Sequence, residues 1–543
     1  MNKVSVKEKL GYGLGDAAAN IGWRGVGTFL FIFYTDVFGL DPVTVGVLFL
    51  TVRFSDGISD ILMGVIGDRT QSKYGKFRPW ILWTAIPLAI SLVLLFSSPD
   101  LSVTGKIIYA YITYLFFTLM YTANNIPYGA LMAVMSSDDK ERTSIGSYRM
   151  VGAFGGGILV QGALLFLIAY FGNVDPVIEI SKMDTKTYQV DIVATRDAEK
   201  VKVKTEDGIA TFKWNDDRSL ENTPTVGKSF KMESGKTYSF IVSGESNLTS
   251  ENMRIINQKR GYSYSMRSMA VVLVILMFIT FYSTRERVLP PKDQKANLKQ
   301  DFKDLAANRP WWILLITGLF SSSYNAIKQG IIIIYFTHYL HDQLLAASYL
   351  VGLMLVSIVG AVLMTPLSLK FGKRNLFISS LFLSGAVISL LIFCDSTAVV
   401  LIFTIGLLSE LIGALFSCLF FVMLGDAADY SEWKNGRRAT GLVYSAGSFA
   451  TKFGGGIAGA IIGLILGAFH YNGLDTTSIE GAIPGIKMLM SWVPGIVAVI
   501  GAGIMLFYPL TKKKMSEITS DLAQRRLDEA ALISGETNDK REF

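Results

Sequence analysis

The chain has 543 residues and a net charge of +7, and it is 51% hydrophobic but only 17% charged. This composition is too apolar for a soluble globular protein, so we expect a membrane protein. We attribute the positive charge to membrane topology and predict no nucleic-acid partner. The two cysteines, Cys394 and Cys418, match no metal or redox spacing, and we predict no cofactor.

Apolar windows of about 20 residues recur along the chain, and this length crosses roughly 30 Å of hydrocarbon. The charged N-terminus lacks a small-residue cleavage site, so we expect no signal peptide. The fold class we predict is an all-α membrane protein with twelve transmembrane helices, at residues 10–35, 42–66, 79–97, 105–135, 145–171, 264–283, 311–337, 345–368, 374–394, 398–425, 440–468 and 486–510.

Basic residues are distributed unequally between the two sets of predicted loops. One set is rich in lysine and arginine, whereas the short loops of the other set contain only Lys106 and Lys487. By the positive-inside rule the basic loops face the cytoplasm. We therefore predict a multi-pass protein of the cytoplasmic (inner) membrane with both termini in the cytoplasm.

The chain divides into segments of different character. From 172 to 262 it becomes polar and strand-like, with runs such as TYQVDIVAT and KTYSFIV, which predicts a small external β-rich insert that an outside partner could bind. The predicted organisation is transmembrane helices 1–5 in 1–171, the insert in 172–262, helix 6 in 263–284, a cytoplasmic central loop in 285–310, helices 7–12 in 311–510 and a cytoplasmic tail in 511–543.

The two membrane halves repeat several motifs. FYTDVFG recurs as YFTHYLH, KYGKFRPWIL as KFGKRNLFI, and FGGGI occurs in both halves. Two six-helix repeats are typical of alternating-access transporters, in which the substrate site lies between the halves near the middle of the bilayer. The sequence thus favours an alternating-access transporter built from two six-helix halves.

Ionisable residues inside the predicted spans are the strongest functional signal, because each costs at least roughly 2.5 kcal/mol at the centre of a membrane. In the second span, Arg53, Asp56 and Asp60 follow the spacing i, i+3, i+7 and share one helical face with Ser59 nearby. Two carboxylates one turn apart repel each other unless a proton or a cation lies between them. We interpret this face as a cation site; the alternative is a structural ion pair with Arg53.

Polar residues in the first and fourth spans suit a hydroxyl-rich ligand. Asp16, Asn20 and Arg24 are spaced by four residues on one face of the first span. The fourth span contains YTANNIPYGAL, in which Thr122 and Asn125 share a face and Asn124, Asn125 and Tyr128 are substrate candidates. Hydrogen bonding between helices is the alternative role for the two asparagine amides.

Further charged residues complete the set of candidates. Arg149 and Lys328 are cations in the fifth and seventh spans, and Lys452 in the eleventh could move between carboxylates as a cation comes and goes. The candidates for coupling or gating are Arg53, Lys452, Asp68, Lys76, Arg78, Asp426 and Asp429. The three histidines, His338, His341 and His470, are predicted to lie near the outer surface in contact with water.

These residues resemble the glycoside-pentoside-hexuronide:cation symporter family of the major facilitator superfamily, typified by the melibiose carrier. The most specific matching segment is DILMGVIGDRTQSKYGKFRPWIL, supported by GDAAAN, FYTDVFGL, NNIPYGAL and DAADYSEWK. The resemblance implies that Asp16 binds sugar hydroxyls, that Asp56, Asp60 and Thr122 bind the coupling cation, and that Arg149 and Lys452 line the sugar pocket. Ser59 stands where the melibiose type has asparagine, and Asn125 where it has aspartate, so melibiose itself is not expected.

We therefore predict a secondary active transporter, not an enzyme, that couples uptake of a glycoside, pentoside or hexuronide to inward flow of Na+ or H+. One alternative is a lipid or lysolipid transporter of the same fold, which would need a wide apolar pocket open to the bilayer. The other is a non-transporting membrane sensor that uses the external insert as its receptor.

Overall fold

A computed structural model describes residues 4–136, 139–174, 176–184, 187–195, 198–204, 211–214, 230–232, 234–243, 254–287, 305–436 and 440–539. Within these residues nine helices are long and apolar enough to cross a membrane. Most of the predicted central loop, 285–310, and much of the predicted insert lie outside the described residues.

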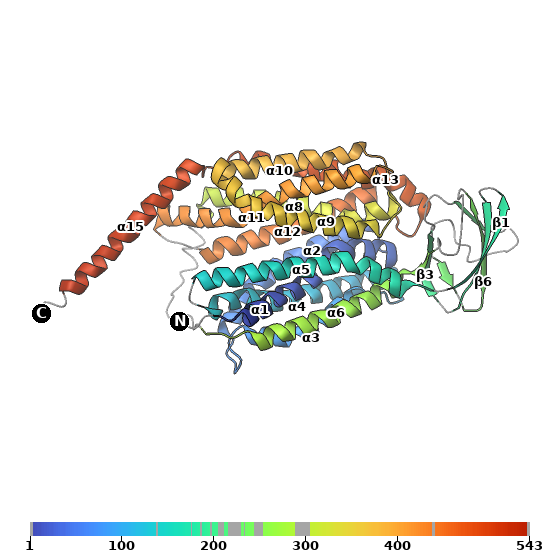
Figure 1. The fold of residues 1–543 in the computed structure, drawn as a ribbon, viewed down its shortest axis with the longest axis horizontal. Helices are drawn as coiled ribbons and strands as arrows, with labels where there is room; N and C mark the ends of the chain where they lie inside the picture. Colours follow the sequence, from blue (N-terminus) through green and yellow to red (C-terminus); the bar gives the residue numbers. More distant parts are fainter. Residues whose placement is uncertain are drawn as a thin grey trace.

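The helices form two groups that lie side by side (Figure 1). The first group is α1 (Val6–Ile32, extended by a π-helical turn, η1, Phe33–Val37), α2 (Pro42–Arg69), α3 (Arg78–Leu95), α4 (Val103–Met135), α5 (Asp139–Gly172) and α6 (Gln258–Ser283). The second is α8 (Arg309–His338), α9 (Leu345–Phe371), α10 (Lys373–Ser389, followed by the 3-10 turn η3, Leu390–Phe393), α11 (Val399–Asn435), α12 (Thr440–Ala468), α13 (Thr476–Met490) and α14 (Trp492–Met505). The tail helix α15 (Lys512–Asp539) extends away from both groups.

The pairing of helices is the same in the two groups. In the first group α1 packs on α5 and α6, α3 packs on α4 and α6, and α2 packs on α4. In the second, α8 packs on α12 and α14, α10 packs on α11 and α14, and α9 packs on α11. The groups meet through α2 with α12, α5 with α9 and α1 with α8. A repeated six-helix arrangement of this kind places one interface between two similar halves.

Several helix starts follow from local sequence. Ser5, Asp41, Ser102 and Asn308 each accept a hydrogen bond from a backbone N–H of the first turn that follows them. Such caps satisfy N–H groups that have no partner within the helix and stabilise it by about 1 kcal/mol each.

The last predicted span differs from the structure. Instead of one helix over 486–510, the chain forms α13 and α14 with a break at Ser491, whose φ is −126° and ψ −83°. Pro494 follows three residues later; it has no N–H to donate, and its ring clashes with the carbonyl four residues earlier. The stretch that is apolar enough to cross a membrane runs from Thr477 to Met505, so it begins and ends earlier than the predicted span 486–510.

Between α5 and α6 the chain forms two small antiparallel sheets. Their strand orders are β1-β2-β6-β4 and β5-β3-β7. Along β2, Tyr188, Val190 and Ile192 are buried while the residues between them are not, as expected when one face of a strand packs on a core. The strands are β1 (Val177–Asp184), β2 (Thr187–Val193), β3 (Ala198–Lys204), β4 (Thr211–Trp214), β5 (Phe230–Met232), β6 (Thr237–Ser243) and β7 (Arg254–Asn257).

The sheets lie at one end of the helical body, which we call the sheet end, and both chain termini lie at the opposite, termini end (Figure 1). The two groups of helices are in close contact toward the sheet end. There a Cβ added to Gly46 on α2 would lie 2.9 Å from the carbonyl oxygen of Gly459 on α12. Glycine thus lets the two backbones approach closely at this point.

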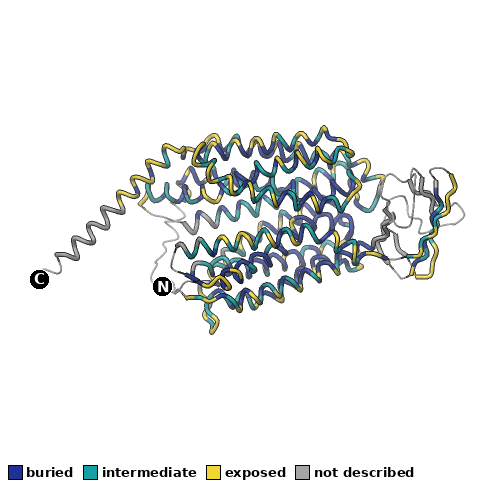
Figure 2. Tube along the Cα trace, viewed as in Figure 1, coloured by how far each residue is buried: buried dark blue, intermediate teal, exposed yellow. Residues whose placement is uncertain are grey.

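Glycines further along the helices have different surroundings. No described atom lies within 4 Å of a Cβ built on Gly64 of α2 or on Gly155 of α5, whereas a Cβ on Gly157 would lie 2.5 Å from Met354 of α9. The tube in Figure 2 shows buried residues concentrated along the middle of the body. The two halves are thus in close contact at the sheet end and through the middle of the body.

One prediction about this region was wrong. His338 is not in contact with water; only 6% of its surface is exposed. Its Nε2 lies 2.7 Å from Asp36 Oδ2, and the Tyr471 hydroxyl donates to Asp36 Oδ1 over 2.7 Å. The carboxylate of Asp36 on η1 supplies the partners that burial of the imidazole requires, and together the three side chains join the two halves at the sheet end.

Candidate functional site

Asp56 and Asp60 share one hydroxyl on the facing helix. Thr122 Oγ1 of α4 lies 3.0 Å from Asp56 Oδ1 and 3.0 Å from Asp60 Oδ1. A hydroxyl has a single hydrogen, so it can donate to only one carboxylate at a time. When the Thr122 hydroxyl donates to one carboxylate, its oxygen faces an oxygen of the other carboxylate with no hydrogen between them. A proton or a cation bound between these oxygens would relieve their repulsion.

Two protein cations neutralise this pair of carboxylates. Lys452 Nζ lies 2.6 Å from Asp60 Oδ2 and 3.3 Å from Asp56 Oδ1. Arg53 Nη1 lies 3.3 Å from Asp56 Oδ2, and its guanidinium stacks 4.3 Å from the centre of the Trp23 ring. Asp56 is only 1% exposed, and the opposite charges of Arg53 and Lys452 offset the cost of burying its carboxylate.

Ser59 lies beside the carboxylates but is not bonded to either within the described chain. Its hydroxyl donates to the backbone carbonyl of Asp56 over 2.9 Å. The oxygen set that the structure brings together is thus Asp56, Asp60 and Thr122, while the contribution of Ser59 stays a prediction.

A second cluster lies where α1, α4 and α5 meet. Arg149 Nε is 3.4 Å from Asp16 Oδ1, and its guanidinium lies 5.5 Å from the centre of the Tyr128 ring. Tyr128 stacks on Tyr12 at 4.6 Å between ring centres, and its hydroxyl donates to the Tyr12 backbone carbonyl over 2.6 Å. The Tyr128 hydroxyl thus ties α4 to α1, which leaves Asp16 and Arg149 as the charged groups of this cluster.

The three predicted amide side chains have different surroundings. Asn20 donates to the backbone carbonyl of Asp16 over 2.9 Å, and the buried Asn124 donates to Thr84 Oγ1 of α3 over 2.8 Å. Asn125 is half-buried and has no hydrogen-bond partner among the described residues. Of these amides, Asn125 is therefore the one whose donors and acceptor are all free, while the buried Oδ1 of Asn124 also has no partner among the described residues.

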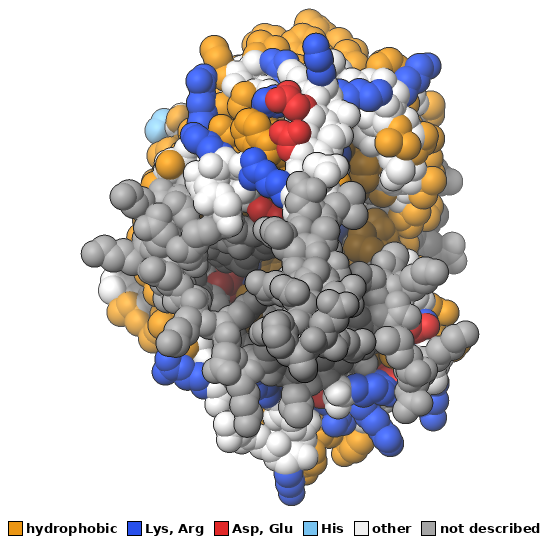
Figure 3. Space-filling view, turned by 90° about the vertical axis from the view of Figure 1, so that its left-hand side faces the viewer, with side chains coloured by type: hydrophobic (Ala, Val, Ile, Leu, Met, Phe, Trp, Pro, Cys, Tyr) orange, Lys and Arg blue, Asp and Glu red, His pale blue; other side chains and the backbone are white. Residues whose placement is uncertain are grey.

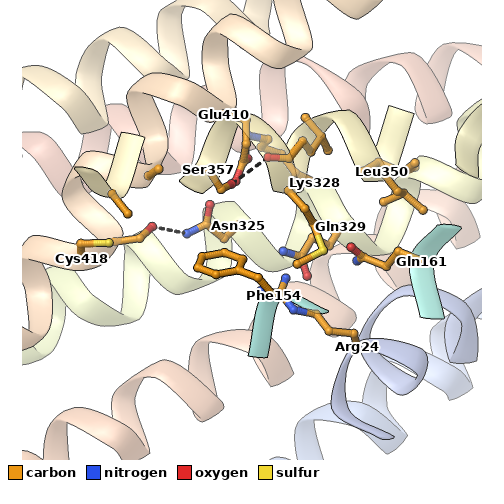
Figure 4. A pocket seen from close by; sticks show the side chains of 16 residues that line it. Arg24, Phe154, Gln161, Asn325, Lys328, Gln329, Leu350, Ser357, Glu410 and Cys418 are labelled. Atoms are coloured by element: carbon orange, nitrogen blue, oxygen red, sulfur yellow. Dashed lines mark hydrogen bonds and ion pairs between the residues drawn. The ribbon is translucent and has the colours of Figure 1, made fainter. Parts of the chain in front are cut away.

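Lys328 and Arg24 belong to a separate cavity of about 270 Å³ between α1, α5, α8, α9 and α11 (Figure 4). Lys328 Nζ lies 3.0 Å from Glu410 Oε2, and Ser357 donates to Glu410 Oε1 over 2.8 Å. Glu410 was not among the sequence candidates, although a glutamate inside the apolar run LLSELIGALF is the same signal that identified Asp56. The remaining lining residues are Phe154, Gln161, Asn325, Gln329, Ile332, Leu350, Leu353, Met354, Ala361, Ala414, Ser417 and Cys418.

The gating candidates lie toward the termini end. Glu286, which sequence reasoning missed, accepts hydrogen bonds of 2.8–2.9 Å from the backbone N–H groups of Lys76, Phe77 and Arg78. A carboxylate at the start of a helix is stabilised by these free N–H groups and by the helix dipole.

On the other half, Asp426 pairs with Lys373 over 2.6 Å. Asp429 lies one turn further along α11 and is half-buried. Asp68 is in the last turn of α2, and its side chain lies outside the described residues.

The family described as MFS/sugar transport protein matches residues 11–195 and 234–512. The chain belongs to this family. One relative is the inner membrane symporter YicJ of Escherichia coli (strain K12), 31% identical over 527 residues that cover 96% of this chain and 95% of that protein. Another is the isoprimeverose transporter of Lactiplantibacillus pentosus, 31% identical over 535 residues that cover 98% of this chain and 94% of that protein.

Solved structures share the fold of this MFS/sugar transport protein. A D-xylose-proton symporter aligns with a TM-score of 0.57 and 12% identity over 94% of this chain and 98% of its own. A bacterial homologue of the human lysosomal transporter Spinster aligns with a TM-score of 0.61 and 12% identity over 94% of this chain and 97% of its own. The mostly helical major facilitator fold and the membrane location of the family member are therefore established.

Proposed function

We propose that this family member is a secondary active transporter that couples inward movement of a glycoside, pentoside or hexuronide to inward flow of Na+ or H+ by alternating access. The observation that carries the proposal is the position of Lys452, whose ammonium lies against both Asp56 and Asp60. One half of the protein supplies this ammonium, and the carboxylates of the other half hold it. The relatives named as an inner membrane symporter and as an isoprimeverose transporter support the same function.

The coupling step follows from charge balance. With Arg53 and Lys452 in place, two carboxylates face two cations, so an incoming Na+ or proton would leave the site with excess positive charge. The incoming cation therefore displaces Lys452, because Arg53 belongs to the same helix as the carboxylates. Release of Lys452 removes an ionic link between α2 and α12, and this is how cation binding alters the contact between the halves.

The substrate site proposed for this cycle lies between the halves and includes both the cluster of Asp16 and Arg149 and the cavity lined by Arg24 and Lys328. Asp16, Asn125 and Arg149 offer polar and charged groups to sugar hydroxyls. Asn20 and Tyr128 donate to backbone carbonyls nearby, and Asn124 donates to the Thr84 hydroxyl. Coupling requires that sugar and cation raise each other's affinity by the same factor. These polar groups also disfavour a lipid as substrate.

The proposed topology has twelve transmembrane helices, both termini in the cytoplasm and the sheets outside the cell. Helices α1, α2 and α8 would cross the membrane together with the nine more apolar ones, because they pack among them. Lys and Arg side chains lie around the periphery of the termini end (Figure 3), as the positive-inside rule requires for a cytoplasmic face.

Transport by purified protein in liposomes tests the proposal. Uptake of a panel of glycosides, pentosides and hexuronides is measured under a Na+ gradient, a pH gradient or neither, and exchange is measured by counterflow. Asp56→Asn should abolish cation-driven accumulation while part of the exchange remains. Asp100→Asn, whose side chain is 81% exposed, is the matched control and should behave as wild type. Unchanged accumulation in Asp56→Asn would exclude the cation site.

A further inference from the structure

The cavity beside Arg24 lies apart from the carboxylate pair and has a size suited to a small ligand. Its volume of about 270 Å³ is near the lower end of the roughly 300–1,000 Å³ of small-molecule pockets. One wall is contributed by α1 and α5 of the first group, and the other by α8, α9 and α11 of the second. A ligand in this cavity would thus contact both halves, as a transported substrate must.

The charges that line the cavity do not cancel. Lys328 and Glu410 form an ion pair, and both carboxylate oxygens of Glu410 already accept a hydrogen bond, from Lys328 and from Ser357. Figure 4 shows Arg24 on the side of the cavity opposite to this pair. Within the described part of the chain, Arg24 has no hydrogen-bond or ion-pair partner, so the lining has one excess positive charge.

An anionic ligand suits the guanidinium of Arg24. A guanidinium has five N–H donors and no acceptor, and its planar fork matches the two oxygens of a carboxylate. The amide and hydroxyl oxygens of the lining can accept from it but cannot remove the excess charge, whereas a carboxylate does both.

We propose that Arg24 binds the carboxylate of the transported sugar, so that the substrate is an acidic sugar of the hexuronide class rather than a neutral glycoside. This inference rests on the proposed transport function and narrows its substrate class. The Lys328–Glu410 pair, which is neutral as a whole, lines the facing side of the same cavity and then lies beside the sugar hydroxyls.

Binding of two sugars that differ in one group tests this assignment. Methyl β-glucuronide and methyl β-glucoside have the same ring, and the carboxylate replaces a hydroxymethyl group. Calorimetry on the purified protein should show tighter binding of the glucuronide by roughly 10- to 100-fold, the range for a hydrogen-bonded charge. In Arg24→Gln this ratio should fall close to one, and Arg24→Lys, which keeps the charge but not the fork, should give an intermediate ratio.

Arg267→Gln is the matched control, because Arg267 is exposed on α6 away from the cavity; it should keep the wild-type ratio. Equal affinity of the wild type for both sugars, or an equal loss for both in Arg24→Gln, would overturn the carboxylate assignment. If the carboxylate assignment fails but neutral sugars are taken up in a cation-dependent way, the proposed transport function still holds. Absence of cation-dependent uptake for the whole panel of sugars would instead overturn the function itself.

Discussion

Lys452 on α12 reaches across the interface between the halves and places its ammonium 2.6 Å from Asp60 on α2. The same ammonium lies 3.3 Å from Asp56, so a single side chain of one half neutralises the carboxylate pair of the other. The backbones are close here as well, since a Cβ on Gly456 would lie 2.9 Å from the Cβ of Arg53. Charge at this site and contact between the halves are thus linked physically.

Removal of the ammonium should separate cation binding from the contact between the halves. In Lys452→Gln the carboxylates lose a competing positive charge, so the apparent affinity for the coupling cation should rise by at least roughly tenfold. Sugar affinity, measured by calorimetry with and without the cation, should lose its cation dependence. Lys513→Gln in the exposed start of the tail helix is the control. An unchanged cation affinity would mean that Lys452 does not compete for the site.

The close approach of α2 and α12 at the sheet end should depend on glycine. Gly46→Ala places a methyl group 2.9 Å from the Gly459 carbonyl oxygen, whereas alanine would otherwise favour the helix by about 1 kcal/mol. The clash should shift the population toward a state open at the sheet end. Spin labels at the exposed Val103 and Val400 should then report a longer distance. Gly27→Ala is the control, because no described atom lies within 4 Å of its Cβ.

Tyr471 should stabilise closure of the sheet end through its hydroxyl. Tyr471→Phe removes the 2.7 Å bond to Asp36 and the 3.0 Å contact with His338, at a cost of about 1–3 kcal/mol to the closed state. The same pair of spin labels should show a larger open population. Tyr335→Phe is a matched control, since the buried Tyr335 hydroxyl has no partner among the described residues and should be dispensable. Equal behaviour of the two variants would exclude a role for Tyr471 in closure.

The buried Lys328–Glu410 pair should contribute to stability only as a pair. Glu410→Gln leaves the ammonium of Lys328, 3% exposed, without its counter-charge, and should lower stability by roughly 3–5 kcal/mol. The double variant Lys328→Met, Glu410→Gln removes the uncompensated charge and should recover much of that loss. Thermal unfolding of the detergent-purified protein measures both. If the double variant is as unstable as the single one, the pair is not the source of the effect.

Part of the candidate site was predictable from residue spacing. Arg53, Asp56 and Asp60 had to share a face once α2 was helical, and Thr122 was expected to meet them. Its hydroxyl does lie 3.0 Å from both carboxylates. Glu410 could have been found by the same reasoning, because it interrupts an apolar run.

Contacts between distant segments were not predictable in this way. His338 was assigned to water because histidine near a helix end is usually solvated, yet Asp36 and Tyr471, from 302 and 133 residues away, bury it. The cap that Glu286 provides for the backbone of Lys76 and Arg78 spans a similar separation. Neither the partner nor the geometry of such contacts is encoded in local periodicity.

The sequence by itself determined that this protein is a polytopic membrane protein with repeated halves, because hydrocarbon thickness and the cost of buried charge act on each segment separately. It also determined which faces of α1 and α2 are charged, since helical geometry is local. Only the tertiary structure decided that Lys452 lies against both Asp56 and Asp60, that Arg24 lines a cavity with no ion-pair partner within the described chain, and that the two halves approach closely at the sheet end. These features depend on how the two halves pack together, and packing across an interface is a property of the whole chain.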